Sequence, residues 1–263
     1  MSEFFGIGGY QRPAEGYLSW QHLLFVSSLM VVMIACSVWF GLRLKKTEEK
    51  EKNLPLIVAA IAIDTLELFK IIFLCFRNEN PLDWLHNLPL FLCSIQLITI
   101  PLAAFTHGRL KEISMDFVFV FGILGAVMGT YFAGNNYSVY PVLSFDNVVS
   151  GLTHSISGFA SLYIVISGQA SMKWKNLPFT CLTMLVFCVL AYIADVTIPY
   201  NYMFLMRGDG TPYDILFNLV GGNPVIYPLL AVILFFVYIT AFYGVYHLVL
   251  NLLQKRRSDR AVS

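Results

Sequence analysis

The sequence predicts an all-α membrane protein: a single bundle of seven transmembrane helices, with the N-terminus outside and the C-terminus cytoplasmic. Of its 263 residues, 57% are hydrophobic and 13% are charged, and the mean hydropathy is +0.69. These values lie well outside the range of soluble globular proteins. Apolar segments of about 20 residues, the length that crosses a hydrocarbon core of about 30 Å, recur along the chain. The basic residues collect in alternate connections, as the positive-inside rule requires.

The apolar segments and their connections set the predicted domain organisation. Residues 1–18 lack the basic start, apolar core and small-residue cleavage site of a signal peptide, so we expect a short external segment and a retained first span. Residues 19–252 form the seven-helix domain, and 253–263 a basic cytoplasmic tail. The predicted spans cover residues 19–42, 55–76, 84–106, 116–134, 146–169, 178–200 and 224–250.

The charges of the connections orient the predicted bundle. The side assigned to the cytoplasm holds thirteen basic residues, while the other side holds Arg12, Arg77 and Arg207. Four tryptophans at or just beyond the span ends agree, since indole rings favour the membrane interface. The thirteen are Arg43, Lys45, Lys46, Lys50, Lys52, Arg109, Lys111, Lys173, Lys175, Lys255, Arg256, Arg257 and Arg260.

Composition also limits the kinds of partner and cofactor that we expect. A formal net charge of +1 gives no basis for a nucleic-acid partner. Five cysteines, an odd number without paired spacing, predict neither a disulfide framework nor a zinc site, and no nucleotide or other cofactor is implied. We therefore expect an integral, multi-pass membrane protein in contact with membrane lipid.

The stretch LHNLPLFLCSIQLITIPL, residues 85–102, is apolar enough to cross a bilayer but carries unusual polarity. Taken as one helix, it places His86, Cys93 and Gln96 on a single face. Exposing that face to lipid would cost several kcal/mol, so we expect it to look into the bundle. Pro89 cannot donate a backbone hydrogen bond, and is expected to kink the helix and make room for a ligand.

Depth along the predicted helices relates three residues that are distant in sequence. At a rise of about 1.5 Å per residue, Cys93 and His154 both lie roughly 12–14 Å below the outer boundary, and Glu67 reaches a similar level. A thiol, an imidazole and a carboxylate can serve as nucleophile, base and orienting group. A cysteine in a membrane helix can also be a simple packing residue. The remaining histidines are expected at the interfaces: His22, His107 and His247.

The second span carries three ionisable residues, Asp64, Glu67 and Lys70, spaced three apart. Such groups are expensive in a membrane, so they are typical of a functional site. A purely structural ion pair between Glu67 and Lys70 is the alternative. Near the outer end of the sixth span, Asp195 precedes Asn201 and Tyr202, and these three are expected to line the mouth of an outward-opening pocket.

Four short motifs together resemble the YwaF-like integral membrane family. They are PLFLCSI (89–95), the isolated His154, PYNYMFL (199–205) and GGNPVIY (221–227), and the resemblance extends from about residue 55 onward. That family groups small bacterial proteins with a vertebrate branch implicated in acyl transfer to ether phospholipids. The resemblance therefore implies a bacterial cell membrane and a small amphiphilic substrate. The resemblance implies that Cys93 and His154 match the pair proposed for acyl chemistry. Phe91 stands where many bacterial members have a histidine, which puts any role of that position in doubt.

Two functions follow from these observations. In the first, the protein is an intramembrane thiol-dependent acyltransferase, with the catalytic residues Cys93, His154 and Glu67, and with Asp195 as an alternative to Glu67 for orienting the imidazole. In the second, it is a non-catalytic transporter or sensor of a small amphiphile. Substrate contacts are expected from His86, Gln96, Asp64, Lys70, Asp195, Asn201 and Tyr202.

Overall fold

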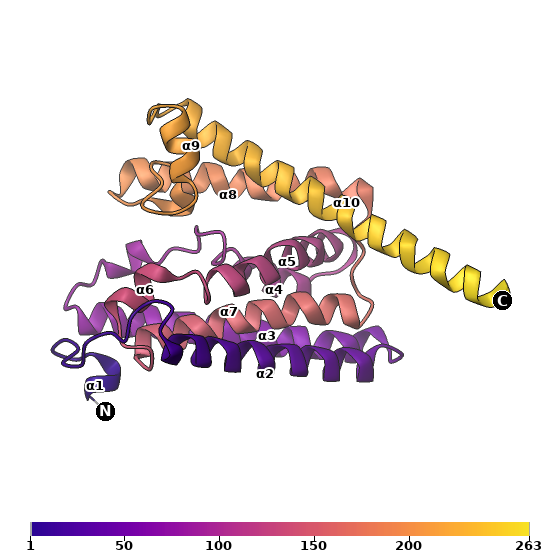
Figure 1. The fold of residues 1–263 in the computed structure, drawn as a ribbon, viewed down its shortest axis with the longest axis horizontal. Helices are drawn as coiled ribbons and strands as arrows, with labels where there is room; N and C mark the ends of the chain where they lie inside the picture. The colour runs from indigo at the N-terminus through magenta and orange to yellow at the C-terminus, as the bar shows by residue number, and fades with distance from the viewer. Residues whose placement is uncertain (1, 263) are drawn as a thin grey trace. The chain divides into compact units, whose positions relative to one another are not determined.

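In the computed structural model, which describes residues 2–262, every regular element is a helix (Figure 1). The chain divides into two compact units, Met1–Ala170 and Ser171–Ser263. Unit 1 contains α1 (Ser2–Phe5), α2 (Trp20–Leu44), α3 (Glu49–Arg77), η1 (Asp83–His86), α4 (Gln96–Phe105), α5 (Gly108–Met128), α6 (Gly134–Val139) and α7 (Phe145–Ile166). Unit 2 contains η2 (Trp174–Asn176), α8 (Leu177–Thr197), η3 (Tyr202–Phe204), α9 (Asp214–Leu219) and α10 (Ile226–Val262).

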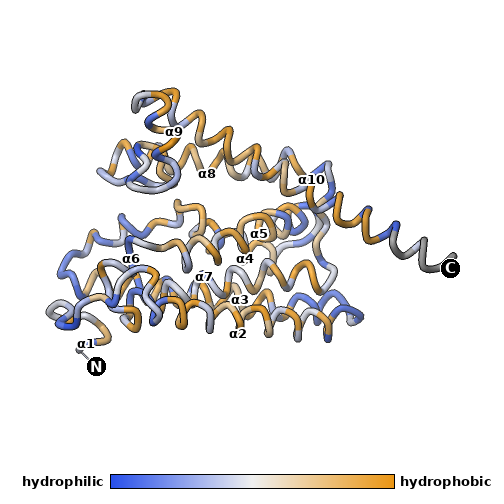
Figure 2. The backbone as a smooth tube through the Cα atoms, viewed as in Figure 1, coloured by the Kyte–Doolittle hydropathy of each residue, from blue (hydrophilic) through white to orange (hydrophobic). Residues whose placement is uncertain are grey.

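Four helical stretches in the described residues are long and apolar enough to cross a membrane. They are Trp20–Leu44, Phe145–Ile166, Trp174–Thr197 and Ile226–Lys255, and Figure 2 shows the largely apolar course of α2, α8 and α10. The helices α3 and α5 match them in length but carry more charge. The protein is thus a multi-pass helical membrane protein, while the count of seven spans and the orientation of the termini stay predictions.

The third predicted span, residues 84–106, is not one helix. The short η1 ends at His86, the backbone from 87 to 95 is irregular, and α4 begins only at Gln96. Proline disfavours helical backbone in the residue before it and lacks an N–H of its own. Around Pro89 the chain makes a tight turn instead, in which the Leu90 N–H donates to the Leu88 carbonyl at 2.7 Å.

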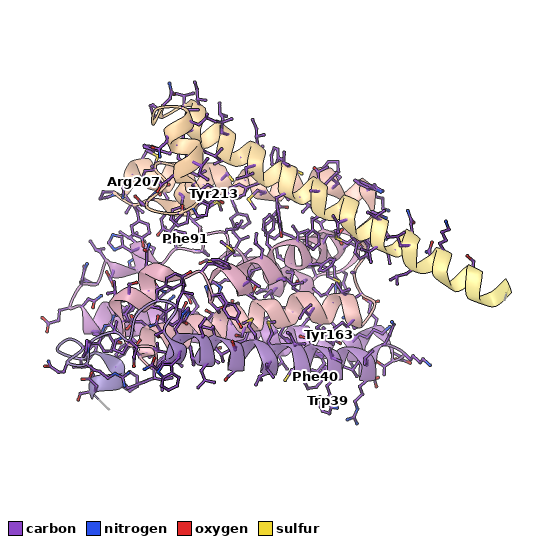
Figure 3. All side chains as sticks on the ribbon, viewed as in Figure 1. Trp39, Phe40, Phe91, Tyr163, Arg207 and Tyr213 are labelled. Carbon is purple, nitrogen blue, oxygen red and sulfur yellow. The ribbon has the colours of Figure 1, made fainter. Side chains whose placement is uncertain are left out.

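This break corrects two sequence-based arguments. The shared face of His86, Cys93 and Gln96 was wrong, because a helical period does not apply across residues 87–95. The depth assigned to Cys93 used the rise of a continuous helix, which does not apply to this segment, so that depth stays a prediction. In a membrane, irregular backbone is tolerated only where protein surrounds it or where it lines a cavity. The segment 87–95, in which Figure 3 labels Phe91, therefore needs its neighbours in unit 1 for support.

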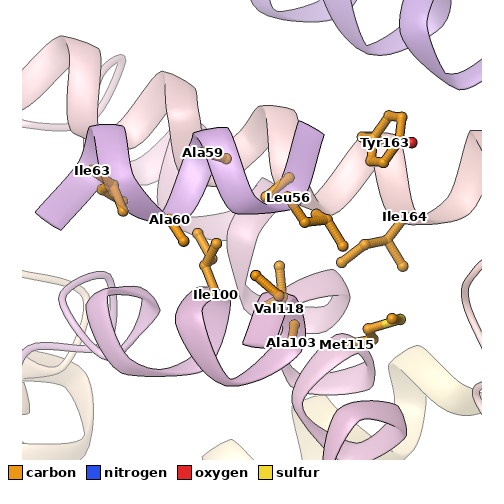
Figure 4. Packing of buried hydrophobic residues seen from close by; sticks show 12 residues of the cluster. Leu56, Ala59, Ala60, Ile63, Ile100, Ala103, Met115, Val118, Tyr163 and Ile164 are labelled. Carbon is orange, nitrogen blue, oxygen red and sulfur yellow. The ribbon is translucent and has the colours of Figure 1, made fainter. Parts of the chain in front are cut away.

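The core of unit 1 forms around α7, which packs against α2, α3, α4 and α5. Small residues contribute to this core: Ala59 and Ala60 of α3 lie in one cluster with Ala103 and Ala104 of α4, and Figure 4 labels the first three of these. Small side chains let helix backbones approach closely, and this close packing drives association where lipid removes the hydrophobic advantage. The α5–α7 contact follows the same plan, since a Cβ on Gly122 would lie 2.7 Å from the Ser157 carbonyl oxygen.

The N-terminal segment is docked onto unit 1 through a charged cluster. Arg77 at the end of α3 binds Asp146 of α7 in a two-pronged ion pair, with N–O distances of 2.7 and 3.0 Å. The Tyr10 hydroxyl donates to the same carboxylate at 2.5 Å, and Arg77 also donates to the Phe5 carbonyl at 3.2 Å. Burial, and then the bond to Asp146, raises the pKa of Tyr10 to about 12.

Unit 2 is a pair of long helices, α8 and α10, joined by a loop that folds on itself. Asn201 organises the loop: its amide donates to the Arg207 carbonyl at 2.7 Å and to Asp209 at 2.8 Å, and its oxygen accepts the Met206 N–H at 2.9 Å. Figure 3 labels Arg207 and Tyr213 in this region. Between the helices, the hydroxyls of Thr180 and Tyr243 lie 3.1 Å apart.

Candidate functional site

The helix α5 supports both Cys93 and His154. A Cβ placed on Gly125 would lie 3.6 Å from the Cβ of Cys93, so the irregular segment passes directly over this glycine. A Cβ placed on Gly129 would overlap the imidazole ring of His154, which projects from α7 onto the end of α5. Residues four apart share one face of a helix and are separated by about 6 Å along its axis. The thiol and the imidazole are therefore neighbours, one helical turn apart.

Cys93 and His154 also remain accessible. Both side chains are half-buried, so each keeps surface that a ligand atom can reach. The Cys93 sulfur lies 4.0 Å from the Ser94 hydroxyl. In the described part of the chain, the His154 ring has no hydrogen bond. Neither group is thus committed to a structural partner, as is expected of groups that act on a ligand.

The ionisable residues of α3 lie near the pair. Glu67 and Lys70 form an ion pair with an N–O distance of 2.5 Å, as their spacing predicted, and their side chains are 11% and 20% exposed. Lys70 is close enough to act electrostatically on both Cys93 and His154, and Glu67 acts on Cys93. Glu67 therefore has Lys70 as its charged partner, and the expectation that it orients the imidazole stays a prediction.

The other predicted contacts of unit 1 lie in different surroundings. His86 is at the end of η1, with a side chain 41% exposed and its Nδ1 3.5 Å from Asp83. Gln96 begins α4, is fully buried, and accepts the Thr99 hydroxyl at 3.2 Å. Asp64 is half-buried on α3. Of these three, Gln96 is joined directly to the Cys93 backbone, since its N–H donates to the Cys93 carbonyl at 3.3 Å.

The residues predicted for the mouth belong to unit 2. The structure brings Asp195 and Tyr202 together, since one carboxylate oxygen accepts the Tyr202 N–H at 2.7 Å. Asn201 is held in the loop network described above. All three are buried within unit 2, with Asp195 and Asn201 each 6% exposed. Their part in a site with Cys93 stays a prediction.

Two features of the site escaped the sequence-based reasoning. The first is the glycine spacing in GILGAVMG, residues 122–129, whose pattern of small residues is typical of close helix contacts. The second is His22, expected at an interface but fully buried. Its Nδ1 accepts the Leu18 N–H and its Nε2 lies 3.1 Å from the Thr130 carbonyl, next to Gly129. These bonds require the neutral ring with the proton on Nε2, so His22 anchors the end of α5 against which the His154 ring packs.

A partly open hollow lies elsewhere in unit 1. It has a volume of about 820 Å³ and lies where the N-terminal segment meets the end of α3. Neither Cys93 nor His154 lines it. The assignment of the candidate site therefore rests on chemistry and geometry rather than on cavity size. The lining residues are Ile7, Gly8, Cys75, Phe76, Arg77, Glu79 and Pro81.

Comparison with known proteins gives one informative result. Neither the curated proteins nor the solved structures provide a match. A family model, described as the TMEM164 family, matches residues 17–246 and so includes both units. That range begins at the end of the N-terminal segment and extends into α10. The chain therefore belongs to the TMEM164 family of membrane proteins.

Proposed function

We propose that the protein transfers an acyl chain between amphiphilic lipids within the membrane, with Cys93 as nucleophile and His154 as acid and base. The observation that supports this most directly is that the two side chains pack against successive turns of α5, Cys93 at Gly125 and His154 at Gly129. A thiol needs a base to become an effective nucleophile. A gap of about one helical turn admits the acyl carbonyl between sulfur and imidazole.

The reaction proceeds in two half-reactions. The Cys93 thiolate attacks the carbonyl carbon of a donor ester, so that a sulfur–carbon bond forms and the bond to the donor's alcohol oxygen breaks. His154 takes the thiol proton and returns it to the departing alcohol. The hydroxyl of an acceptor then attacks the thioester, its proton passes to His154, and the sulfur leaves and is reprotonated. One ester is consumed and one is formed, without oxidation or reduction.

Lys70 gives the site an electrostatic component. A positive charge near sulfur stabilises the thiolate and the oxyanion that develops on the acyl carbon, and this interaction is strong where water is scarce. Glu67 holds the ammonium in place through the ion pair. Glu67 therefore acts through Lys70 in this mechanism, as a positioning residue.

The test is acyl transfer by purified protein in liposomes, from a radiolabelled phospholipid to a lysophospholipid. We expect Cys93→Ser and His154→Ala each to lower the rate by roughly 100-fold or more, the usual contribution of acid–base catalysis. Folding is checked for each variant by its elution from a sizing column. Full activity in Cys93→Ser would rule out the thiol-dependent mechanism.

Two glycines provide a matched pair of variants. A methyl group on Gly129 must push the His154 ring aside, whereas one on Gly125 meets Cys93 at ordinary contact distance. Neither glycine has a positive φ, so alanine fits both backbones. We expect Gly129→Ala to fold but to lose most activity, and Gly125→Ala to keep most of it. Equal activity in the two variants would show that the seat of His154 on α5 is not required.

A second candidate function is a non-catalytic carrier or sensor of an amphiphile. It is favoured by the ion pair and by Asp64, three ionisable groups on one face of α3. A carrier should keep amphiphile binding in Cys93→Ser and lose it in Glu67→Gln. Binding is measured with a fluorescent lysophospholipid. An enzyme should also bind this lipid in the Cys93→Ser variant, but should lose acyl transfer.

A further inference from the structure

Two buried polar atoms between α3 and α4 lack a partner in the described part of the chain: Oδ1 of Asp64 and Nε2 of Gln96. Gln96 is fully buried, and its other amide atom, Oε1, accepts the Thr99 hydroxyl. A buried polar group without a hydrogen bond is costly, and more so in a membrane than in a soluble protein. One of these atoms is an acceptor and the other a donor.

The register of the two helices puts these atoms at one level. The Asn53 amide of α3 donates to the Ala104 carbonyl of α4 at 2.5 Å, while Ala60 and Ile100 share the core cluster (Figure 4). Increasing numbers on α3 thus pair with decreasing numbers on α4, and the helices are antiparallel. Asp64 lies one turn beyond Ala60, and Gln96 lies one turn before Ile100. Both residues therefore lie one turn from the level of Ala60 and Ile100, toward the same end of the helix pair.

The helical period also directs both residues toward the gap between α3 and α4. Asp64 follows Asn53 by eleven residues, close to three whole turns, and Asn53 points at α4. Gln96, Ile100 and Ala103 follow the spacing of a single stripe, and the last two pack in the cluster that includes Ala60. An acceptor and a donor therefore face the same gap between α3 and α4, without a bond to each other.

We propose that Asp64 and Gln96 form a subsite for the hydroxyl group of a lipid substrate. A hydroxyl can donate to the carboxylate and accept from the amide at once, which a ketone, an ether or an ester cannot do. Water has the same capacity, so the experiment separates the two. The role of the subsite in catalysis rests on the proposed function; its binding of a hydroxyl does not.

The position of the subsite matches the second half-reaction. Gln96 is linked to Cys93 through its backbone N–H, and Asp64 lies one turn from Glu67 on α3. The bound hydroxyl is therefore about one helical turn from the thioester that Cys93 would carry. Asp64 holds the O–H bond in the resting complex and Gln96 fixes the oxygen. As the oxygen attacks, the O–H bond turns from Asp64 to His154, which receives the proton. The acceptor class is thus a lipid alcohol rather than an amine.

Binding is tested with 1-decanol and 1-methoxydecane, which differ in their ability to donate a hydrogen bond. In detergent, we expect 1-decanol to raise the Tm of the protein by more than 1-methoxydecane does. Asp64→Leu and Gln96→Leu should remove this difference, and Gln96→Met replaces the latter if it does not fold. Asn53→Leu is the matched control, since it removes a polar group between the same helices about three turns away, and should keep the preference.

Kinetics form the second arm. We expect Asp64→Leu and Gln96→Leu to form the Cys93 thioester at the wild-type rate but to show a KM for the acceptor raised about tenfold, the effect of one lost hydrogen bond. Equal Tm shifts from 1-decanol and 1-methoxydecane in the wild type would contradict the proposed hydroxyl subsite. They would indicate that water binds Asp64 and Gln96 instead. A decanol preference without any thioester on Cys93 would support the subsite and refute acyl transfer.

Discussion

Two irregular segments, one in each unit, use their polar residues in different ways. In the loop of residues 198–213, the side chain of Asn201 bonds to Arg207, Asp209 and Met206, so its donors and its acceptor are satisfied locally. In the segment of residues 87–95, the Cys93 thiol has only a distant hydroxyl beside it, and Gln96, which follows, keeps an unpartnered amide nitrogen. The closed network of Asn201 holds its loop in place. The hydrogen-bonding groups of residues 87–96 that lack a partner remain available to a ligand.

The largest expected effect comes from opening the closed network. Asn201→Ala removes the four hydrogen bonds of this side chain and leaves partly buried backbone groups without partners, so we expect the free energy of unfolding to fall by about 3 kcal/mol. Equilibrium unfolding in mixed detergent micelles measures this. Cys93→Ala is the control from the open segment, with an expected loss below about 1 kcal/mol. Similar losses in the two variants would remove the distinction between the segments.

A smaller effect is expected from the ion pair beside the open segment. Lys70→Ala leaves the Glu67 carboxylate without its cation in a largely buried position, and we expect a loss of about 2–3 kcal/mol. The double variant Lys70→Ala with Glu67→Gln should recover part of this loss, because it also removes the unpaired charge. The same unfolding assay applies. Additive losses would show that the two residues do not stabilise the fold as a pair.

The smallest effect concerns the second closed network, formed by Tyr10, Arg77 and Asp146. The pKa of Tyr10 rises from 10.0 to about 12, so its contribution to stability is complete below pH 10 and is lost as the pH passes 12. Tyr10→Phe should lower the Tm by a constant amount at pH 8 and pH 9, and the difference from wild type should vanish by pH 12. A difference that persists at pH 12 would mean that the phenol proton is not involved.

The sequence allowed the long apolar helices to be predicted, because α2, α7, α8 and α10 follow from composition and length alone. The break at residues 87–95 could not be predicted, since apolarity does not distinguish a helix from an irregular segment that its neighbours support. From Pro89, we expected a kinked helix. In fact, the helix does not form until Gln96.

For the candidate site, the structure places Cys93 and His154 near each other, but by a route that differs from the sequence-based argument. Cys93 and His154 were paired by assuming two straight helices at a common depth. The structure instead brings them together over Gly125 and Gly129 of a third helix, α5. Side-chain room at a glycine depends on the tertiary packing, which no periodicity in the sequence contains. The pairing of Glu67 with Lys70 was predictable, because it depends only on spacing within one helix.

The short length of α4 has a consequence for membrane asymmetry. Its ten residues extend about 15 Å, which is half of a hydrocarbon core of about 30 Å. In the predicted crossing of residues 84–106, the remaining half is the irregular segment, on the side where Arg77 and the N-terminal residues meet. Lipids in the leaflet on that side would reach Cys93 laterally, while those of the opposite leaflet would first have to flip. The proposed reaction would then change the lipid composition of one leaflet and leave the other as it was.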